Sequence, residues 1–132
     1  MSKEAVLLVM YRKKRAGLLQ FLGAVPVALL TACRCAEALD CLSRNGGIGV
    51  VLTDTDLPDG TWDLPLRNVQ RRSPETPVVV CTSFPTPKLV AEVFEQGAFD
   101  LLMAPYTEQE VRNAVEAAMN KALMTARSPG VS

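Results

Sequence analysis

Residues 48–60 read IGVVLTDTDLPDG, a nearly continuous apolar run that ends in three carboxylates within six residues. Such a run is typical of a strand buried on both faces of a parallel sheet. Ligands of an open parallel sheet bind outside the carboxyl ends of its strands, so Asp54 is predicted to be an exposed, functional carboxylate at that edge. The alternative is that Asp54, Asp56 and Asp59 are loop and cap residues, because Asp favours such positions in any protein.

Apolar runs on either side of this stretch predict the fold class. Pro26 indicates that the strand expected at 25–30 lies at a sheet edge or that the proline stands near its start. Pro65 must lie in the first turn of the helix expected at 61–72. Thr86 and Thr107 have the spacing of helix N-caps. Five strands that alternate with five helices imply an α/β fold with a five-stranded parallel sheet, doubly wound. The expected strands lie at 5–10, 25–30, 48–53, 77–81 and 99–103, and the expected helices at 14–22, 36–43, 61–72, 87–96 and from 107 onward.

Length and composition indicate one domain, because the 132 residues are 48% hydrophobic and only 21% charged. We expect residues 1–125 to form it and 126–132 to be a C-terminal linker or an artificial chain end. Lys plus Arg and Asp plus Glu both number 14, which gives no electrostatic case for nucleic-acid binding by this domain alone. No apolar run approaches the roughly 20 residues of a membrane span, and the N-terminus lacks a secretory signal pattern. We therefore expect a cytoplasmic protein without membrane contact.

The four cysteines do not form a metal-binding pattern, since the sequence has no histidine and no second closely spaced pair. A zinc site would need Cys41 or Cys81 to join Cys33 and Cys35. We interpret Cys41 and Cys81 as small core residues and expect Cys33 and Cys35 to be the more reactive pair. All four are expected to be reduced and unpaired in a cytoplasmic protein.

Three segments, in this order and at this spacing, are similar to one known family. They read DTDLPDG at 54–60, SPETPVVVCTS at 73–83 and GAFDLLMAPY at 97–106. Over residues 5 to about 124 the chain resembles the receiver domain of two-component response regulators, in particular receivers attached to sigma-54-dependent activators. The resemblance implies a flavodoxin-like sheet of strand order 2-1-3-4-5. It also implies that Asp54 is the phosphoacceptor and that Thr82 supplies the hydroxyl that follows the phosphoryl group.

The chain departs from this family where the family binds Mg²⁺ and where it switches. Met10 and Tyr11 stand at the positions of the family's acidic pair, and Ala104 replaces the family's lysine before Pro105. Leu101 replaces the family's switch aromatic. Mg²⁺ prefers several carboxylate and water ligands, so the phosphoacceptor aspartate by itself makes a poor metal site. We expect no cofactor and an impaired Mg²⁺-dependent phosphorylation.

A basic run, RKKR at 12–15, follows the position of the missing acidic pair. We predict that Arg12 or Lys13 pairs with Asp54 or Asp56 in the space of the metal, which would hold one conformation without phosphate. The alternative is a solvated helix start, in which the cations face water. Besides Asp54 and Thr82, the predicted pocket contains Met10, Tyr11, Arg12, Asp56, Ala104 and Pro105.

Together these features predict an atypical receiver-like signalling module that is not an enzyme. Its output would be protein–protein contacts through residues 89–96 and 111–119, and the process that it regulates would be transcription. The expected partners are a histidine kinase or an effector domain, with a homodimer through the last two helices. One alternative is a working receiver that a histidine kinase phosphorylates on Asp54. Another is a flavodoxin-like enzyme or nucleotide binder, although the glycine-rich segment at 45–49 precedes a strand, whereas phosphate loops follow one.

Overall fold

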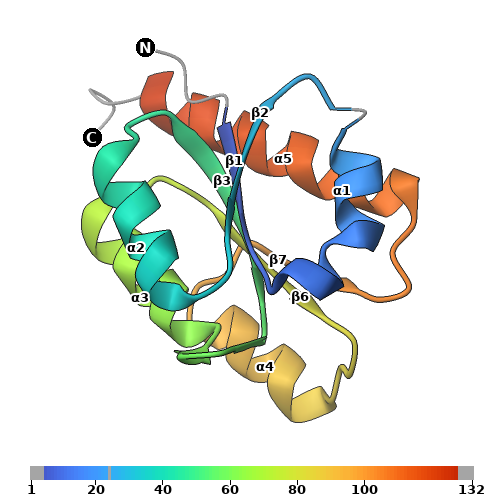
Figure 1. Cartoon of the computed structure of the whole chain (residues 1–132). Helices are drawn as coiled ribbons and strands as arrows, with labels where there is room; N and C mark the ends of the chain where they lie inside the picture. Colours follow the sequence, from blue (N-terminus) through green and yellow to red (C-terminus); the bar gives the residue numbers. More distant parts are fainter. Residues whose placement is uncertain (1–4, 24, 128–132) are drawn as a thin grey trace.

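The computed structural model describes residues 5–23 and 25–127, which form one sheet with helices on both faces (Figure 1). The strands of that sheet are β1 (Ala5–Val9), β2 (Ala28–Ala32), β3 (Ile48–Asp54), β6 (Val78–Thr82) and β7 (Asp100–Met103). The helices are η1 (Arg12–Lys14, a 3₁₀ turn), α1 (Ala16–Leu22), α2 (Cys35–Arg44), α3 (Asp63–Arg72), α4 (Pro87–Glu95) and α5 (Glu108–Arg127). A separate two-stranded hairpin consists of β4 (Asp56–Leu57) and β5 (Gly60–Thr61).

The sheet is parallel throughout and has the strand order β2-β1-β3-β6-β7. This is the predicted doubly wound, flavodoxin-like order, and the predicted edge position of the second strand is confirmed. Because all five strands run the same way, their carboxyl ends meet at one edge of the sheet, and Asp54 is the last residue of the central strand β3.

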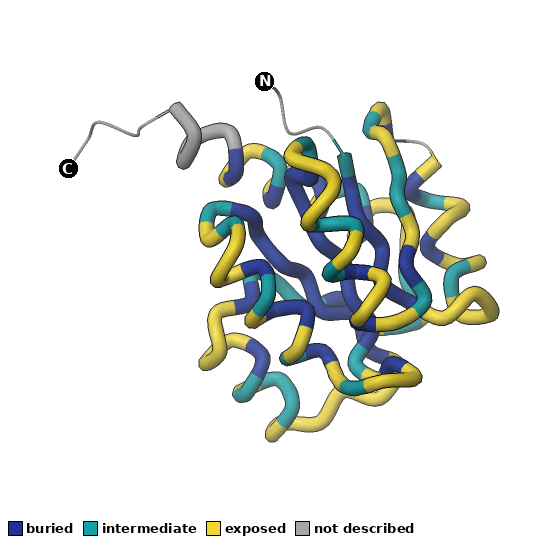
Figure 2. The backbone as a smooth tube through the Cα atoms, turned by 60° about the vertical axis from the view of Figure 1, so that its left-hand side comes forward, coloured by how far each residue is buried: buried dark blue, intermediate teal, exposed yellow. Residues whose placement is uncertain are grey.

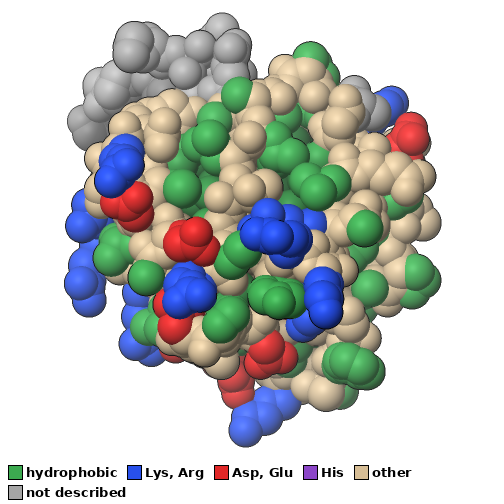
Figure 3. Space-filling model, in the orientation of Figure 1, with side chains coloured by type: hydrophobic (Ala, Val, Ile, Leu, Met, Phe, Trp, Pro, Cys, Tyr) green, Lys and Arg blue, Asp and Glu red, His purple; other side chains and the backbone are tan. Residues whose placement is uncertain are grey.

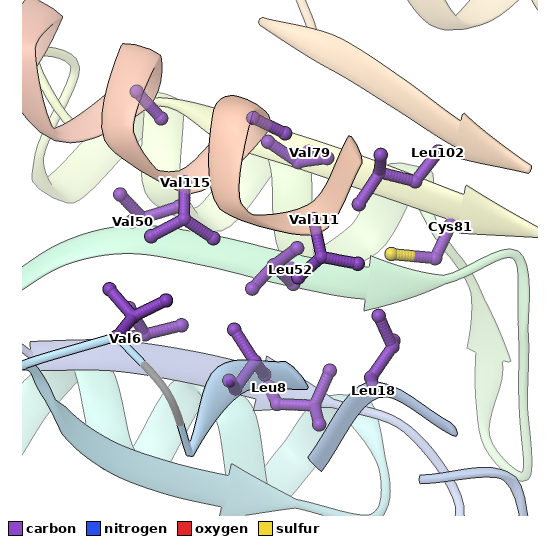
Figure 4. Close-up of a cluster of buried hydrophobic side chains, with 14 of the residues drawn as sticks. Val6, Leu8, Leu18, Val50, Leu52, Val79, Cys81, Leu102, Val111 and Val115 are labelled. Carbon is purple, nitrogen blue, oxygen red and sulfur yellow. The ribbon is translucent and has the colours of Figure 1, made fainter. Parts of the chain in front are cut away.

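Two hydrophobic clusters fill the space between the sheet and its helices. Alternate residues of each strand point to opposite faces, so Val6 and Leu8 of β1 pack toward α1 and α5, while Leu7 and Val9 pack toward α2, α3 and α4. Figure 4 shows the first cluster, in which Val111 and Val115 of α5 lie over side chains of the central strands. Figure 2 shows the consequence, with buried central strands and exposed outer sides of the helices.

Local signals in the sequence explain most helix boundaries. Thr86 accepts the backbone N–H of Leu89 and so caps α4, and Thr107 accepts that of Glu110 at the start of α5. Pro65 is the third residue of α3 and therefore lies in its first turn, as predicted. Gly97 follows α4 with a φ of +100°, a backbone conformation that favours glycine.

Most boundaries lie within two residues of the sequence prediction, and three segments differ more clearly. The second strand covers Ala28–Ala32 instead of 25–30, because Val25 and Val27 donate to a turn after α1 and Pro26 has no N–H to give. The helix expected at 14–22 begins only at Ala16, as α1, and the 3₁₀ turn η1 precedes it at 12–14. The predicted linker begins inside a helix, since residues 126–127 belong to α5, and its remainder lies outside the described residues. None of the described helices has the length and apolar character needed to cross a membrane.

Candidate functional site

A cavity of about 240 Å³ opens at the carboxyl edge of the sheet, around the end of β3. The loops after β1, β6 and β7 supply the rest of its wall, which places it at the edge where ligands of doubly wound sheets bind. The lining residues are Met10, Lys14, Asp54, Ser83, Ala104 and Tyr106.

Asp54 is the one carboxylate in this lining, and it is buried, with only 6% of its surface exposed. The prediction of an exposed carboxylate was therefore wrong, because the surrounding loops close over the end of β3. Its Oδ1 accepts the backbone N–H of Thr55 at 2.7 Å, and its Oδ2 accepts from Lys14 Nζ at 3.2 Å. The buried negative charge is thus matched by one cation, which a buried carboxylate requires.

Lys14 is the residue of the basic run that pairs with Asp54, so the prediction named the correct loop but the wrong residue. Arg12 and Lys13 are exposed and line a different cavity. The reason is the tight 3₁₀ turn η1, which has about three residues per turn and whose Lys14 N–H donates to Tyr11 O at 2.9 Å. The turn brings its last residue back toward the sheet and leaves the first two facing outward.

Arg15 fixes the end of this turn. Its Nε donates to the backbone oxygen of Met10 at 2.7 Å, and its Nη2 donates to Cys33 Sγ at 3.0 Å. The loop that carries Lys14 is therefore bonded to Met10, which directly follows β1, and to the loop after β2, which orients the ammonium group toward Asp54.

The residues around Asp54 do not fit a divalent metal ion. Met10, at the position of one family ligand, is 2% exposed and packs in the core with an uncharged thioether. Tyr11 lies in a different cavity, and Lys14 places a positive charge 3.2 Å from the one carboxylate that could bind a cation. Within residues 5–23 and 25–122, no cluster of three or more His, Cys, Asp or Glu side chains could hold a metal. Mg²⁺ prefers several oxygen ligands, and this wall offers one carboxylate.

Thr82 is buried at the end of β6, directly before the lining residue Ser83. Its Oγ1 accepts the backbone N–H of Phe84 at 3.1 Å. It lines a neighbouring cavity of about 400 Å³ together with Asp56, so Asp56 lies outside the Asp54 pocket in which it was predicted. The other residues around that second cavity are Thr55, Thr61, Trp62, Asp63, Phe84, Leu89, Glu92 and Gln96.

The loop after β7 closes the far side of the Asp54 cavity. Ala104 lines it, as predicted, and the Ala104–Pro105 peptide bond is cis. Tyr106 follows and packs its ring against the core; burial, and then the nearby Cys81 and Asp54, raise the pKa of its phenol. The tyrosine is therefore neutral at physiological pH and adds no charge to the cavity.

The cysteines are all unpaired in the structure, and their burial corrects two predictions. Cys35 was expected to be reactive, but it is buried, and burial followed by the Asp59 carboxylate raises its pKa to about 11. Cys33 is half-buried and lines a cavity. Cys81 is a core residue as predicted, whereas Cys41 is only half-buried.

The comparisons with known proteins agree with this fold. The family model for the response regulator receiver domain matches residues 12–116. The chain belongs to the response regulator receiver domain family. This receiver domain is 30% identical over 120 residues to the response regulator protein PilR of Pseudomonas aeruginosa, a match that covers 90% of this chain and 27% of PilR. It therefore spans about a quarter of that relative's length.

Solved structures share the receiver fold. The signal receiver domain of an HD domain-containing protein from Pseudomonas fluorescens has a TM-score of 0.82 at 23% identity, over 94% of this chain and 99% of that one. NtrX from Brucella abortus, in complex with ATP, has a TM-score of 0.86 at 18% identity, over 96% of this chain and 29% of NtrX. At such identities the likeness shows the fold of the receiver domain and nothing about its chemistry.

Sequence reasoning found part of the receiver pocket. Met10, Asp54 and Ala104 line it as predicted, while Tyr11 and Arg12 line another cavity. Pro105 is exposed and outside the lining. Three lining residues were missed: Lys14, Ser83 and Tyr106. Ser83 and Tyr106 each directly follow a residue that was predicted, so a wider window around Thr82 and Pro105 would have included them.

Proposed function

We propose that this receiver domain is atypical: it signals through protein contacts, is not an enzyme, and does not depend on Mg²⁺-dependent phosphorylation. The observation that carries the proposal is the Lys14–Asp54 pair, with Nζ 3.2 Å from Oδ2. The ammonium group takes over the charge compensation that a metal ion provides in the family.

The chemistry of phosphoryl transfer supports this proposal. Transfer to a carboxylate requires that the negative charge on the equatorial oxygens of the phosphoryl group be neutralised, normally by Mg²⁺. Lys14 supplies one positive charge and Ala104 none, and the wall formed by Met10 and Tyr106 carries no charge. Because Lys14 is already bonded to the acceptor oxygen, an incoming phosphate would also have to displace it.

The residues at the positions that move when a receiver switches also support the proposal that this domain keeps one conformation. The Thr82 hydroxyl is already in a hydrogen bond with the Phe84 backbone. Leu101 is half-buried and packs against the second core cluster, and it has no polar tip that could change partners. A ligand shifts an equilibrium only by its differential affinity for the two states, and this pocket holds few groups that could supply such a difference.

The proposed output surface comprises α4, the edge strand β7 and the outer side of α5. Phe94 and Met103 are both 47% exposed there. Val111 and Val115, which the sequence prediction included, face the core, so α5 contributes its polar side. Receiver domains typically interact with kinases and effector domains. We propose that a kinase or an effector binds this surface, and that a homodimer would form through α4 and α5.

Incubation with acetyl phosphate and Mg²⁺, followed by intact-mass measurement, tests the first half of the proposal. We expect no added phosphoryl mass in the native protein or in Asp54→Asn. An NMR amide spectrum with and without beryllofluoride and Mg²⁺ should be unchanged. A phosphoryl adduct in the native protein that Asp54→Asn abolishes would contradict the proposal.

Substitutions on the surface test the second half. Phe94→Ser and Met103→Ser should weaken binding of a kinase or effector partner, whereas Leu64→Ser, a similarly exposed position on α3, should not. Equal effects of all three variants would argue against an output surface at α4 and β7.

A working phosphoacceptor remains the second candidate, because one set of observations favours it. Asp54 and Thr82 end the neighbouring strands β3 and β6 at the carboxyl edge of the sheet, and the Ala104–Pro105 bond is cis. In that case Lys14 would serve as the cation of the reaction, and phosphorylation would be independent of Mg²⁺. Adduct formation that persists in EDTA and disappears in Lys14→Gln would distinguish this candidate.

A further inference from the structure

The cavity that Tyr11, Arg12 and Lys13 line has a volume of about 670 Å³ and lies on the other side of η1 from Asp54. It is formed by the loop after β1 and by the loop that joins β2 to α2, and its volume is in the range of small-molecule sites. Its lining residues are Tyr11, Arg12, Lys13, Cys33, Arg34 and Glu37.

The lining is strongly positive, although the whole chain has no net charge. Three cations line it against one carboxylate, Glu37, whose Oε1 already accepts the backbone N–H of Cys33 at 2.8 Å. Behind the wall, Arg15 is held against Cys33 and adds a further positive charge. Figure 3 shows Lys and Arg side chains near the middle of the face on which Figure 1 places η1.

These three cations differ from most others on the described surface. Arg12, Lys13 and Arg34 are exposed, and their side chains make no ion pair or hydrogen bond with the described part of the chain. Elsewhere, by contrast, cations pair with an acid one helical turn away: Arg44 with Asp40, Arg67 with Asp63, Lys88 with Glu92 and Arg112 with Glu108. Unpaired like charges around one hollow repel one another, and a bound anion would relieve that repulsion.

The residue types indicate the class of anion. Guanidinium groups match the oxygens of phosphate in a two-point geometry, and Lys adds a point charge. Three cations suit a group that carries several negative charges, such as a diphosphate. Tyr11 is 45% exposed beside them and offers an aromatic face on which a flat ring can stack. The first N–H groups of α2 are already bonded to Asp59, so the anion would be held by side chains.

We propose that this cavity binds a small organic di- or triphosphate, with its phosphates on Arg12, Lys13 and Arg34 and its ring on Tyr11. The site is separate from the Asp54 cavity, so the proposal stands whether or not Asp54 is phosphorylated.

Isothermal calorimetry and NMR titration with adenosine diphosphate, pyrophosphate and citrate test the proposal. We expect saturable binding of adenosine diphosphate, with amide shifts confined to residues 11–15 and 33–37. Pyrophosphate should bind more weakly than adenosine diphosphate because it lacks the ring, and citrate should bind weakest. Arg12→Gln and Arg34→Gln should each weaken binding about tenfold or more, as expected for hydrogen bonds to charged groups.

Control variants distinguish a specific binding site from nonspecific attraction of anions to the positive charge. Arg71→Gln removes an exposed cation on α3 and should leave the affinity unchanged. Tyr11→Ala should lower the affinity for adenosine diphosphate but not that for pyrophosphate. All substituted side chains are exposed, so the variants should fold, which the same spectra verify. No saturable binding of adenosine diphosphate, equal losses of affinity in Arg71→Gln and Arg34→Gln, or binding of citrate as tight as that of pyrophosphate would overturn the proposal.

Discussion

The carboxylate of Asp59 caps α2 from 24 residues away in the sequence, since its Oδ1 accepts the backbone N–H of Cys35 at 2.7 Å. Its Oδ2 accepts the N–H of Ala36 at 3.1 Å. The residue that precedes α2, Arg34, makes no side-chain cap of its own. The last carboxylate of the acidic loop is therefore a structural cap, which is the alternative that the sequence left open for this cluster.

Removing this cap should destabilise the domain. Asp59→Ala should lower the free energy of unfolding by about 1 kcal/mol at neutral pH, the usual effect of losing an N-cap. Urea denaturation measures it. Asp40→Ala, which breaks an exposed pair with Arg44 in the same helix, is the matched control and should change stability by less than about 0.5 kcal/mol.

The loss from Asp59→Ala should also depend on pH. Partial desolvation raises the pKa of Asp59, but the hydrogen bonds from Cys35 and Ala36 outweigh it, so the pKa lies below its ordinary value of 3.8. A carboxylate with a lowered folded pKa stabilises fully above its unfolded pKa and stops doing so as the pH falls through the folded value. The difference between the native protein and Asp59→Ala should therefore shrink in strong acid. A difference in the free energy of unfolding that stays constant from neutral pH into strong acid would show that the negative charge of Asp59 does not contribute to the cap.

Mg²⁺ should bind only after the site is rebuilt. We expect no saturable response of the native protein to millimolar Mg²⁺, and a gain of binding in Met10→Asp/Lys14→Gln, which adds an anion to the lining of the Asp54 cavity and removes the competing cation. Trp62 fluorescence is a convenient signal because Trp62 lines the cavity next to Thr55, and calorimetry should support a negative result. Adding Asp54→Asn should abolish the gain. Saturation of the native protein that Asp54→Asn removes would be the contrary result.

The Thr82 hydroxyl should have a measurable structural role. Thr82→Val keeps the shape of the side chain but leaves the Phe84 N–H without its acceptor, which should cost about 1 kcal/mol. Hydrogen exchange of the Phe84 amide should accelerate in Thr82→Val and stay slow in Thr82→Ser, which retains the hydroxyl. Equal exchange rates in the two variants would mean that this hydrogen bond is not formed in solution.

Thiol labelling should follow burial and not the sequence spacing. An anionic disulfide reagent should modify Cys33 first, since it is half-buried and borders the cations Arg12, Lys13 and Arg34. Cys41 should react more slowly, because burial, and then Asp40 and Glu37, raise its pKa. Cys35 and Cys81 should react only on unfolding, since burial raises the pKa of both. Cys33→Ser should remove the fast phase, and a fast phase that survives this change would contradict the assignment.

The fold was predictable because it depends on patterns that are local in the sequence. Apolar runs such as residues 48–53 define buried strands, and caps such as Thr86 and Thr107 define helix starts. The strand order came from the resemblance to receiver domains, which the family match confirms. The small hairpin at residues 56–61 was missed, because two-residue strands carry no periodic signal.

The sequence by itself determined that a carboxylate would end the central strand, that the family's acidic pair and lysine are absent, and that a basic run lies beside the missing pair. Only the tertiary structure decided which members of these sets meet. The 3₁₀ turn directs Lys14 to Asp54 and turns Arg12 and Lys13 away, and the loop after β3 sends Asp59 to α2. Residue types and hydrophobic periods are encoded locally. A pair 40 residues apart depends instead on the direction in which each loop leaves the sheet, which is fixed by the packing and backbone hydrogen bonds of the whole fold.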